Sequence, residues 1–386
     1  MVKRTILTAI LAAIACGSLL LSAASDVVNV DGGPVAGTAV DGVRVFKGIP
    51  FAAPPVGALR WKAPQPVVPW TGVRNADTFG PECMQTPYPE GSPYAAPPAP
   101  TSEDCLYLNV YSAARSGDRR PVMVWIHGGA WTRGSGSTPT YNGSALAKKG
   151  VVVVTVNYRL GVFGFLAHPE LTAESAHHAS GNYAILDHVA ALEWVKRNIA
   201  GFGGNPANVT IFGESAGSWS VNVVQATPLA KGLFQRAIGE SGGQFARTAT
   251  LATAEGAGVA FMKAAGVDSL KALRALPAEK IQSTQFLRSA VNADGWVLPS
   301  DVRTIFAQKQ HNAGTVLVGS NGNEWTTLSN PAQFPKTMAD YRKRVEAQYG
   351  DAVKEYDAVY PVASDADIAK AMLGVGRDQT FTLEMR

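Results

Sequence analysis

A single pentapeptide, Gly213-Glu214-Ser215-Ala216-Gly217, constrains the fold of this chain more than any other feature. It has the form Gly-x-Ser-x-Gly, in which a serine stands on a sharp turn between a buried strand and a helix. The glycines are needed because a side chain at either position would collide with the neighbouring strand and helix. The turn holds the serine in a strained conformation that exposes its hydroxyl at the end of the sheet.

The sequence on both sides of the pentapeptide fits this geometry. Residues 208–212 form a short apolar run bounded by turn residues, as a central strand should, and residues 216–225 can form the following helix. A lone Gly-x-Ser-x-Gly is a weak signal, because a glycine-rich chain contains some by chance. Without this context Ser215 would be an ordinary turn residue at the end of a strand. With it, the pattern indicates a nucleophile.

The order of the other predicted elements indicates an α/β protein. Apolar runs predict buried strands, and an amphipathic pattern over residues 181–199 predicts a helix with Asp187 off its apolar face. This alternation predicts a large, mostly parallel sheet flanked by helices, with its ligand site at the carboxyl ends of the strands. The further strands are expected at 121–127, 151–157, 233–239 and 314–319, and the further helices at 253–281, 299–308 and within 337–373.

The composition and charge of the chain indicate which class of partner to expect. The chain has 386 residues and 46% hydrophobic content, which is ample for one large α/β domain or two domains. Its formal net charge is +4, to which Lys3 and Arg4 contribute two, and there is no basic run. Nucleic acid is therefore not an expected partner.

The first 25 residues resemble an export signal. Lys3 and Arg4 precede an apolar stretch, and small residues near Ala24 offer a cleavage site, so we expect a secreted or periplasmic protein with no membrane span after removal of the leader. Two alternatives stay open. Residues 5–25 are just long enough for an uncleaved anchor, and Cys16 could be the lipidated residue of a lipoprotein.

Two cysteines, Cys83 and Cys105, lie beyond this leader. In an exported protein the pair suggests one disulfide, the alternative being two free thiols. In the chain-entropy model, closing a loop of this size stabilises the fold by roughly 3 kcal/mol. The residues at 81–100 are rich in Pro, Gly, Ser and Tyr, and we expect them to form a surface loop held by that bond.

Acyl transfer at a serine requires hydrogen-bond donors for an oxyanion, a base, and an acid that orients the base. His127-Gly128-Gly129-Ala130 follows the predicted strand at 121–127 and resembles the turns whose backbone N–H groups face a substrate carbonyl. An ordinary glycine turn is the alternative. The neighbouring Gly-x-Ser-x-Gly favours an oxyanion turn.

Several longer motifs in the chain resemble those of a known protein family. They are Phe46-Lys47-Gly48-Ile49-Pro50-Phe51-Ala52, Ser102-Glu103-Asp104-Cys105-Leu106-Tyr107-Leu108-Asn109-Val110-Tyr111, Val156-Asn157-Tyr158-Arg159-Leu160-Gly161, and the run 181–217. With these motifs the chain resembles type-B carboxylesterases, the family of para-nitrobenzyl esterases, animal carboxylesterases and cholinesterases. The resemblance extends from about residue 27 to the last residue. It implies an α/β-hydrolase fold, with residues 26–386 as one carboxylesterase domain that is incomplete at its C-terminus.

The resemblance also implies a role for individual residues. Ser215 matches the nucleophile, and Glu324 matches the acid of the triad. The pair Cys83 and Cys105 matches the family's first disulfide. Gly129, Ala130 and Ala216 match the residues whose backbone N–H groups form the oxyanion hole. Glu214 and Ser241 match residues that pack beside the triad.

The sequence departs from the family at the base. The family order is serine, acid, histidine, but no histidine follows Glu324. We therefore expect the chain to be truncated, with the base in the missing part. Rescue by another histidine is not expected, because a base must lie within hydrogen-bond reach of the serine. The six candidates are His127, His168, His177, His178, His188 and His311, of which His311 is expected at the surface.

Taken together, these patterns predict a carboxylic-ester hydrolase that acts on small-molecule esters through an acyl-enzyme. No metal or organic cofactor is implied, since no cysteine or carboxylate pattern near the histidines supports zinc. Trp131 and Trp219 are candidates either for an acyl pocket or for the core. Two other hypotheses remain, namely a non-catalytic binding protein of the same fold and an inactive fragment. As it stands, we expect this 386-residue chain to be inactive or nearly so.

Overall fold

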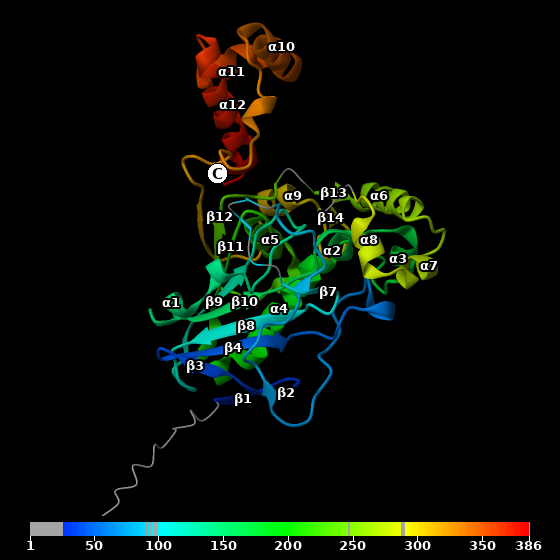
Figure 1. The fold of residues 1–386 in the computed structure, drawn as a ribbon, viewed down its shortest axis with the longest axis vertical. Helices are drawn as coiled ribbons and strands as arrows, with labels where there is room; N and C mark the ends of the chain where they lie inside the picture. Colours follow the sequence, from blue (N-terminus) through cyan, green and yellow to red (C-terminus); the bar gives the residue numbers. More distant parts are fainter. Residues whose placement is uncertain are drawn as a thin grey trace, which may run out of the picture.

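The computed structural model describes residues 26–385, apart from residues 90, 93, 96, 98, 246–247 and 287–289. An eight-stranded mixed sheet forms its centre, in the order β15-β12-β11-β9-β10-β8-β4-β3 (Figure 1). From β15 to β10 neighbouring strands are parallel, and β8, β4 and β3 are added by antiparallel pairing. The large, mostly parallel sheet expected from the sequence is therefore present.

The strands of this sheet are β3 (Thr38–Val40), β4 (Val43–Pro50), β8 (Tyr107–Ser112), β9 (Arg120–Ile126), β10 (Val152–Val156), β11 (Gly204–Glu214), β12 (Arg236–Glu240) and β15 (Thr315–Gly319). Smaller sheets join β1 (Val27–Val30), β2 (Gly33–Ala36) and β5 (Arg74–Asn75), then β6 (Glu82–Cys83) with β7 (Thr101–Ser102), and β13 (Ala249–Thr250) with β14 (Asn292–Ala293).

Strand β10, in which Thr155 is the one polar residue, illustrates why the central strands are mostly apolar. Val152 and Val154 join the main core on one face of the sheet. Val153 points the other way, into a smaller cluster with Tyr111 and with Ala147 of α1 (Ser144–Ala147). Because both faces are covered, a polar residue on either side would be buried.

The main core lies between the sheet and the helices α4 (Tyr183–Asn198) and α5 (Ala216–Ala226), both of which contact β11. The expectation that Asp187 points away from the buried face of α4 is wrong. Its side chain is fully buried, and both its carboxylate oxygens accept hydrogen bonds from the Arg159 guanidinium at 2.7 and 2.9 Å. A buried carboxylate on an otherwise apolar helix is tolerated because this cation pairs with it.

The expectation that residues 314–319 form a buried strand is wrong in one respect. Strand β15 pairs with β12 in register, but every one of its residues is exposed, and the side chain of Leu317 is 64% exposed. The described residues place no further strand beyond β15. An apolar sequence predicts burial only where a second layer covers the strand.

The predicted helical stretch at 253–281 is broken into three helices, α6 (Leu251–Ala264), α7 (Leu270–Ala275) and α8 (Ala278–Ser283). Gly266 has φ +80° and Pro277 stands directly before α8, so neither position continues a helix. The remaining helices before β15 are α2 (Gly161–Phe165), α3 (Pro169–Glu174) and α9 (Val302–Ala307).

The last part of the chain is helical, as predicted. Helices α10 (Met338–Tyr349), α11 (Val353–Val359) and α12 (Ile368–Arg377) enclose a small core of their own, which includes Tyr341 and Tyr356. Figure 1 shows these helices standing apart from the layers that flank the sheet. Residues Glu384 and Met385 return to the main body, where Met385 Sδ accepts a hydrogen bond from the backbone N–H of Gly242 at 3.3 Å.

The predicted export signal at residues 1–25, including Cys16, lies outside the described residues. Within residues 26–385, as far as they are described, no helix has the length and apolar character needed to cross a membrane.

Candidate active site

Ser215 stands at the junction between β11 and α5, as the pentapeptide predicts. Its backbone has φ 54° and ψ −121°, a conformation that costs a non-glycine residue about 1–3 kcal/mol. The turn is held on both sides, because the Ser215 N–H donates to the Glu240 carbonyl at 2.8 Å and its own carbonyl accepts from the Trp219 N–H at 2.9 Å. The surrounding structure therefore fixes the strained serine.

The two glycines of the pentapeptide have no room for a side chain. A Cβ atom on Gly213 would lie 2.6 Å from the Gly217 carbonyl carbon, and one on Gly217 would overlap the Ile126 carbonyl oxygen of β9. Strand, turn and helix are thus in backbone contact. This is the steric reason that the sequence indicated for glycine at both positions.

The turn after β9 lies directly against Ser215. A Cβ atom on Gly128 would lie 3.2 Å from Ser215 Cβ and 2.8 Å from the Glu214 carbonyl oxygen. Gly129 has φ +105°, and Ala130 and Trp131 also have positive φ, at 53° and 59°. The expected oxyanion turn is therefore a tight, left-handed backbone segment in van der Waals contact with the serine.

Glu324 follows β15 by a short loop. Its Oε1 atom accepts hydrogen bonds from the backbone N–H and the side-chain Nδ2 of Asn321, both at 3.0 Å, and from the Ser241 hydroxyl. Ser241 lies just beyond the neighbouring strand β12, and its own N–H donates to the Gly319 carbonyl at 2.7 Å. The structure thus brings together Ser241 and Glu324, which the resemblance placed beside each other.

Glu214, the residue before Ser215, is half-buried. The pKa of the Glu214 carboxyl is raised to about 7, first by burial and then by the negative charges of Glu324 and Glu240. A carboxyl with such a pKa is only partly charged near neutral pH. Of the predicted residues, Ser215, Glu214, Ser241 and Glu324 therefore share one end of the sheet.

No hydrogen bond in the described part of the chain joins a histidine to Ser215. His127 is fully buried under the oxyanion turn, with Nδ1 2.8 Å from the Gly128 carbonyl oxygen and its ring stacked on Tyr158 at 4.3 Å. His188 contacts the other side of Tyr158 at 4.4 Å. Burial lowers the pKa of His127 to about 4 and that of His188 to about 3, so both rings are neutral at pH 7.

The other histidines lie elsewhere. His168 is buried and accepts from the Glu170 N–H at the start of α3, and His177 stacks on Trp296. His311, which we expected at the surface, is half-buried because its ring stacks on Phe306 of α9 at 4.3 Å.

Trp131 and Trp219 are both buried in the main core, with their ring centroids 5.3 Å apart. The Trp131 indole N–H donates to the Ser220 hydroxyl at 2.8 Å. These contacts fit core aromatic residues that support the oxyanion turn and the start of α5.

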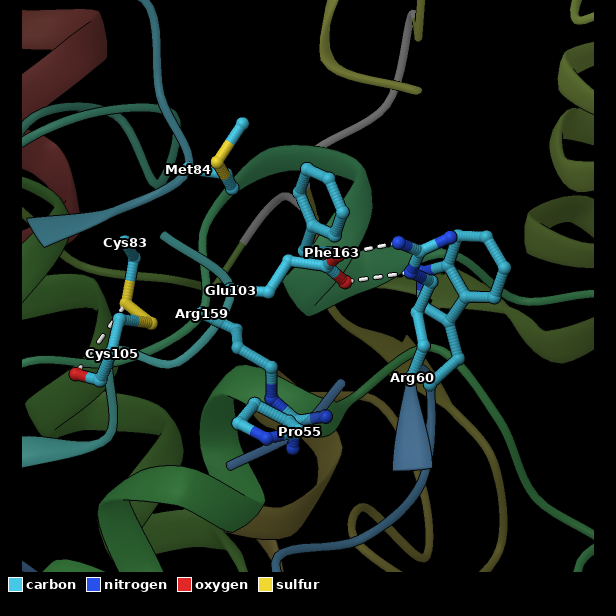
Figure 2. Close-up of a pocket in the computed structure, with 9 residues that line it drawn as sticks. Pro55, Arg60, Cys83, Met84, Glu103, Cys105, Arg159 and Phe163 are labelled. Atoms are coloured by element: carbon cyan, nitrogen blue, oxygen red, sulfur yellow. Dashed lines mark hydrogen bonds and ion pairs between the residues drawn. A yellow bond between two sulfur atoms is a disulfide. The ribbon is translucent and has the colours of Figure 1, made fainter. Parts of the chain in front are cut away.

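Cys83 and Cys105 form the disulfide that the sequence suggested. It borders a small pocket, shown in Figure 2, which is also lined by the ion pair between Arg60 and Glu103 and by Arg159. The cavity volume of about 10 Å³ is enough for roughly one water molecule. This pocket is therefore part of the framework and not a substrate site.

Sequence reasoning missed how the 81–100 loop is anchored. Gln85 holds the oxyanion turn, since its Oε1 accepts from the Gly134 N–H at 2.7 Å and its Nε2 donates to the Gly134 carbonyl at 2.9 Å. The Tyr94 hydroxyl lies 2.7 Å from the Thr327 hydroxyl, three residues beyond Glu324. The loop therefore contacts both the oxyanion turn and the segment that carries Glu324. The only signal in the sequence was the pair of cysteines at its ends.

The comparisons with known proteins agree with this geometry. The model of the carboxylesterase family matches residues 24–377. The chain belongs to the carboxylesterase family. Within the family, it is 42% identical over 350 residues to a fumonisin B1 esterase of Sphingopyxis macrogoltabida, and 46% identical over 358 residues to a para-nitrobenzyl esterase of Bacillus subtilis (strain 168).

These matches cover 88% and 89% of this chain, but 64% of the fumonisin B1 esterase and 72% of the para-nitrobenzyl esterase. Among solved structures, the carboxylesterase EST55 of Geobacillus stearothermophilus superimposes with a TM-score of 0.80 at 37% sequence identity, covering 93% of this chain and 75% of that one. The chain has the family's α/β-hydrolase fold, and it spans about two thirds to three quarters of the length of these relatives.

Proposed function

We propose that this protein is a serine carboxylic-ester hydrolase that acts on small-molecule esters through an acyl-enzyme at Ser215. The observation that carries the proposal is the strained Ser215 at the end of β11 in direct contact with the glycine turn after β9. In this arrangement Ser215 attacks the ester carbonyl, and water then hydrolyses the acyl-enzyme. Membership of the carboxylesterase family supports the same reaction class.

In the proposed reaction, the backbone N–H groups of Gly129, Ala130 and Ala216 stabilise the oxyanion. Such groups are effective because they are already oriented toward the atom on which negative charge develops. Glu324 is the proposed acid, and its contact with Ser241 supports a carboxylate held in one orientation. Glu214 is proposed to pack beside it.

We assign the base to a histidine outside this sequence, because none of the six histidines of the chain is hydrogen-bonded to Ser215. His127 directly precedes Gly128, yet its Nδ1 lies 2.8 Å from the Gly128 carbonyl oxygen and its ring is stacked on Tyr158. Turnover by the 386-residue chain alone that disappears in Ser215→Ala would contradict this assignment.

We further propose that residues 1–25 direct export and are removed, and that residues 26–386 form part of one carboxylesterase domain. The disulfide between Cys83 and Cys105 is consistent with an oxidising compartment.

The test of the function is Ser215→Ala in the protein as its native host produces it, assayed with a simple aryl ester such as 4-nitrophenyl acetate. We expect turnover to fall by at least about 1,000-fold, because the nucleophile is lost while the oxyanion donors remain. Ser116→Ala, at an exposed position beyond β8, is the matched control and should keep full activity. Retained turnover in Ser215→Ala would exclude the proposed mechanism.

A further inference from the structure

Arg133 is a charged residue within the oxyanion turn itself. Its backbone N–H donates to the Gly129 carbonyl at 3.1 Å. Its side chain begins against the same glycine, since a Cβ atom on Gly129 would lie 3.1 Å from Arg133 Cγ. Gly128, the next residue back, contacts Ser215. The stem of Arg133 therefore lies against Gly129, and the preceding residue, Gly128, lies beside Ser215.

The guanidinium of Arg133 has no anionic partner among the described residues. It lies 4.9 Å from the centre of the Tyr88 ring, and one N–H makes a long hydrogen bond of 3.4 Å to the Pro87 carbonyl. The side chain is half-buried. By contrast, Arg60 and Arg159, which lie deeper in the fold, are each paired with a buried carboxylate.

Tyr88 connects this guanidinium with the nucleophile turn. Burial raises the pKa of the Tyr88 hydroxyl, the positive charge of Arg133 lowers it, and the negative charge of Glu214 raises it again. Tyr88 therefore lies within electrostatic range both of Arg133 and of Glu214, the residue next to Ser215. The partly neutral Glu214 carboxyl weakens the repulsion that an anion would meet there.

We propose that Arg133 is a specificity-determining residue that favours esters carrying a second, free carboxylate group. The proposal rests on the esterase function proposed above and names its substrate class. A planar guanidinium can donate two parallel hydrogen bonds to a carboxylate, and a half-buried, unpaired one gains more from such a ligand than an exposed one. Tyr88 holds the guanidinium by a cation–π contact, which leaves available the N–H groups that do not bond to Pro87.

The experiment measures binding and so does not depend on turnover. The probes are the mono-N-methylamide of glutaric acid, which carries a carboxylate, and N-methylbutyramide, which is its neutral counterpart. Both are titrated by saturation-transfer NMR into the chain and into Arg133→Gln, Arg133→Lys and Arg119→Gln. Arg119 precedes β9 at the opposite end of that strand and is an exposed control.

We expect the carboxylate probe to bind the unmodified chain about tenfold more tightly than the neutral probe. Arg133→Gln should abolish that preference, Arg133→Lys should keep part of it, and Arg119→Gln should keep all of it. Equal affinities for the two probes in the unmodified chain, or a preference that survives Arg133→Gln, would overturn the proposal.

If Arg133→Gln does not unfold cooperatively, the salt dependence of the unmodified chain decides. Raising ionic strength from about 0.02 to 0.5 M should weaken the carboxylate probe several-fold and leave the neutral probe unchanged, and equal responses count against the proposal. If the chain shows no Arg133-dependent preference for the carboxylate probe while the native protein shows Ser215-dependent turnover, the proposed esterase function still stands. The reverse result, a preference without any Ser215-dependent turnover in the native protein, removes only the reaction.

Discussion

Ser215 and Glu324 both follow parallel strands of one sheet, but the two strands are packed very differently. Strand β11 lies in the middle of the sheet between β9 and β12, with α4 and α5 against it. Strand β15 is the last described strand, and its side chains are exposed. Ser215 is thus positioned by tight backbone packing, whereas Glu324 depends on hydrogen bonds from Asn321 and Ser241. The fold therefore holds Ser215 and Glu324 in place by different physical means.

The largest expected difference is in tolerance to an added methyl group. Gly217→Ala places a Cβ atom onto the Ile126 carbonyl, and backbone on both sides prevents relaxation. We expect it to lower the free energy of unfolding by about 4 kcal/mol or to prevent folding. Gly319→Ala at the end of β15 meets nothing within 4 Å and should change it by less than about 0.5 kcal/mol. Urea unfolding measures both, and similar losses would remove the contrast.

The second prediction concerns how the free energy of unfolding changes at low pH because His127 and His188 are buried. His127 and His188 have pKa values of about 4 and 3 in the fold, below the ordinary 6.5 of an unfolded histidine. Their contribution to stability is therefore complete above about pH 6.5 and is lost as the pH falls toward these lower values. Between pH 7 and pH 5, we expect a loss of about 2 kcal/mol for each histidine.

The matched variants for this prediction are His188→Gln and His178→Gln, followed by urea unfolding at several pH values. His188→Gln should reduce the loss of stability between pH 7 and pH 5 by about 2 kcal/mol whatever its effect at pH 7, because one buried titrating group is removed. His178 is exposed, so its replacement should leave the pH dependence unchanged. A pH dependence that is the same in both variants would show that burial of His188 does not set it.

A smaller effect is expected for the loop that carries Glu324. Ser241→Ala removes one of the three donors to Glu324 Oε1, which is worth about 1 kcal/mol for a partly buried hydrogen bond. Amide hydrogen exchange should become faster at Asn321 while α5 is unaffected. Thr326→Val, which removes a hydroxyl bonded to the Asn323 carbonyl instead, is the control in the same loop. Unchanged exchange at Asn321 would mean that Ser241 does not hold this loop.

The smallest effect is expected on the outer strand. Leu317→Thr exchanges a 64%-exposed apolar side chain for a polar one that also favours strands. We expect the free energy of unfolding to change by less than about 0.5 kcal/mol, with weaker self-association because the exposed apolar edge is reduced. A loss of more than about 2 kcal/mol would mean that β15 is covered in solution.

The sequence by itself determined the local geometry around the nucleophile. Two glycines around Ser215, an apolar strand before it and a helix after it are encoded within about 20 consecutive residues, and the steric reason for each is local. The central strands were predictable for the same reason, because valines cover both faces of β10, at Val152, Val154 and Val156 on one side and at Val153 on the other. The breaks in the predicted helical stretch at 253–281 were missed, although Gly266 and Pro277 are local signals that end helices.

Only the tertiary structure decided which faces are covered and which distant side chains meet. Asp187 is buried because Arg159, 28 residues away, pairs with it, and Leu317 is exposed because nothing described packs on β15. The contact between Ser241 and Glu324 spans 83 positions. The place of Arg133 beside Tyr88 likewise follows from a loop that Gln85 ties to the oxyanion turn. Residue patterns encode periodicity and turns, whereas partners across the fold are set by how the elements pack together.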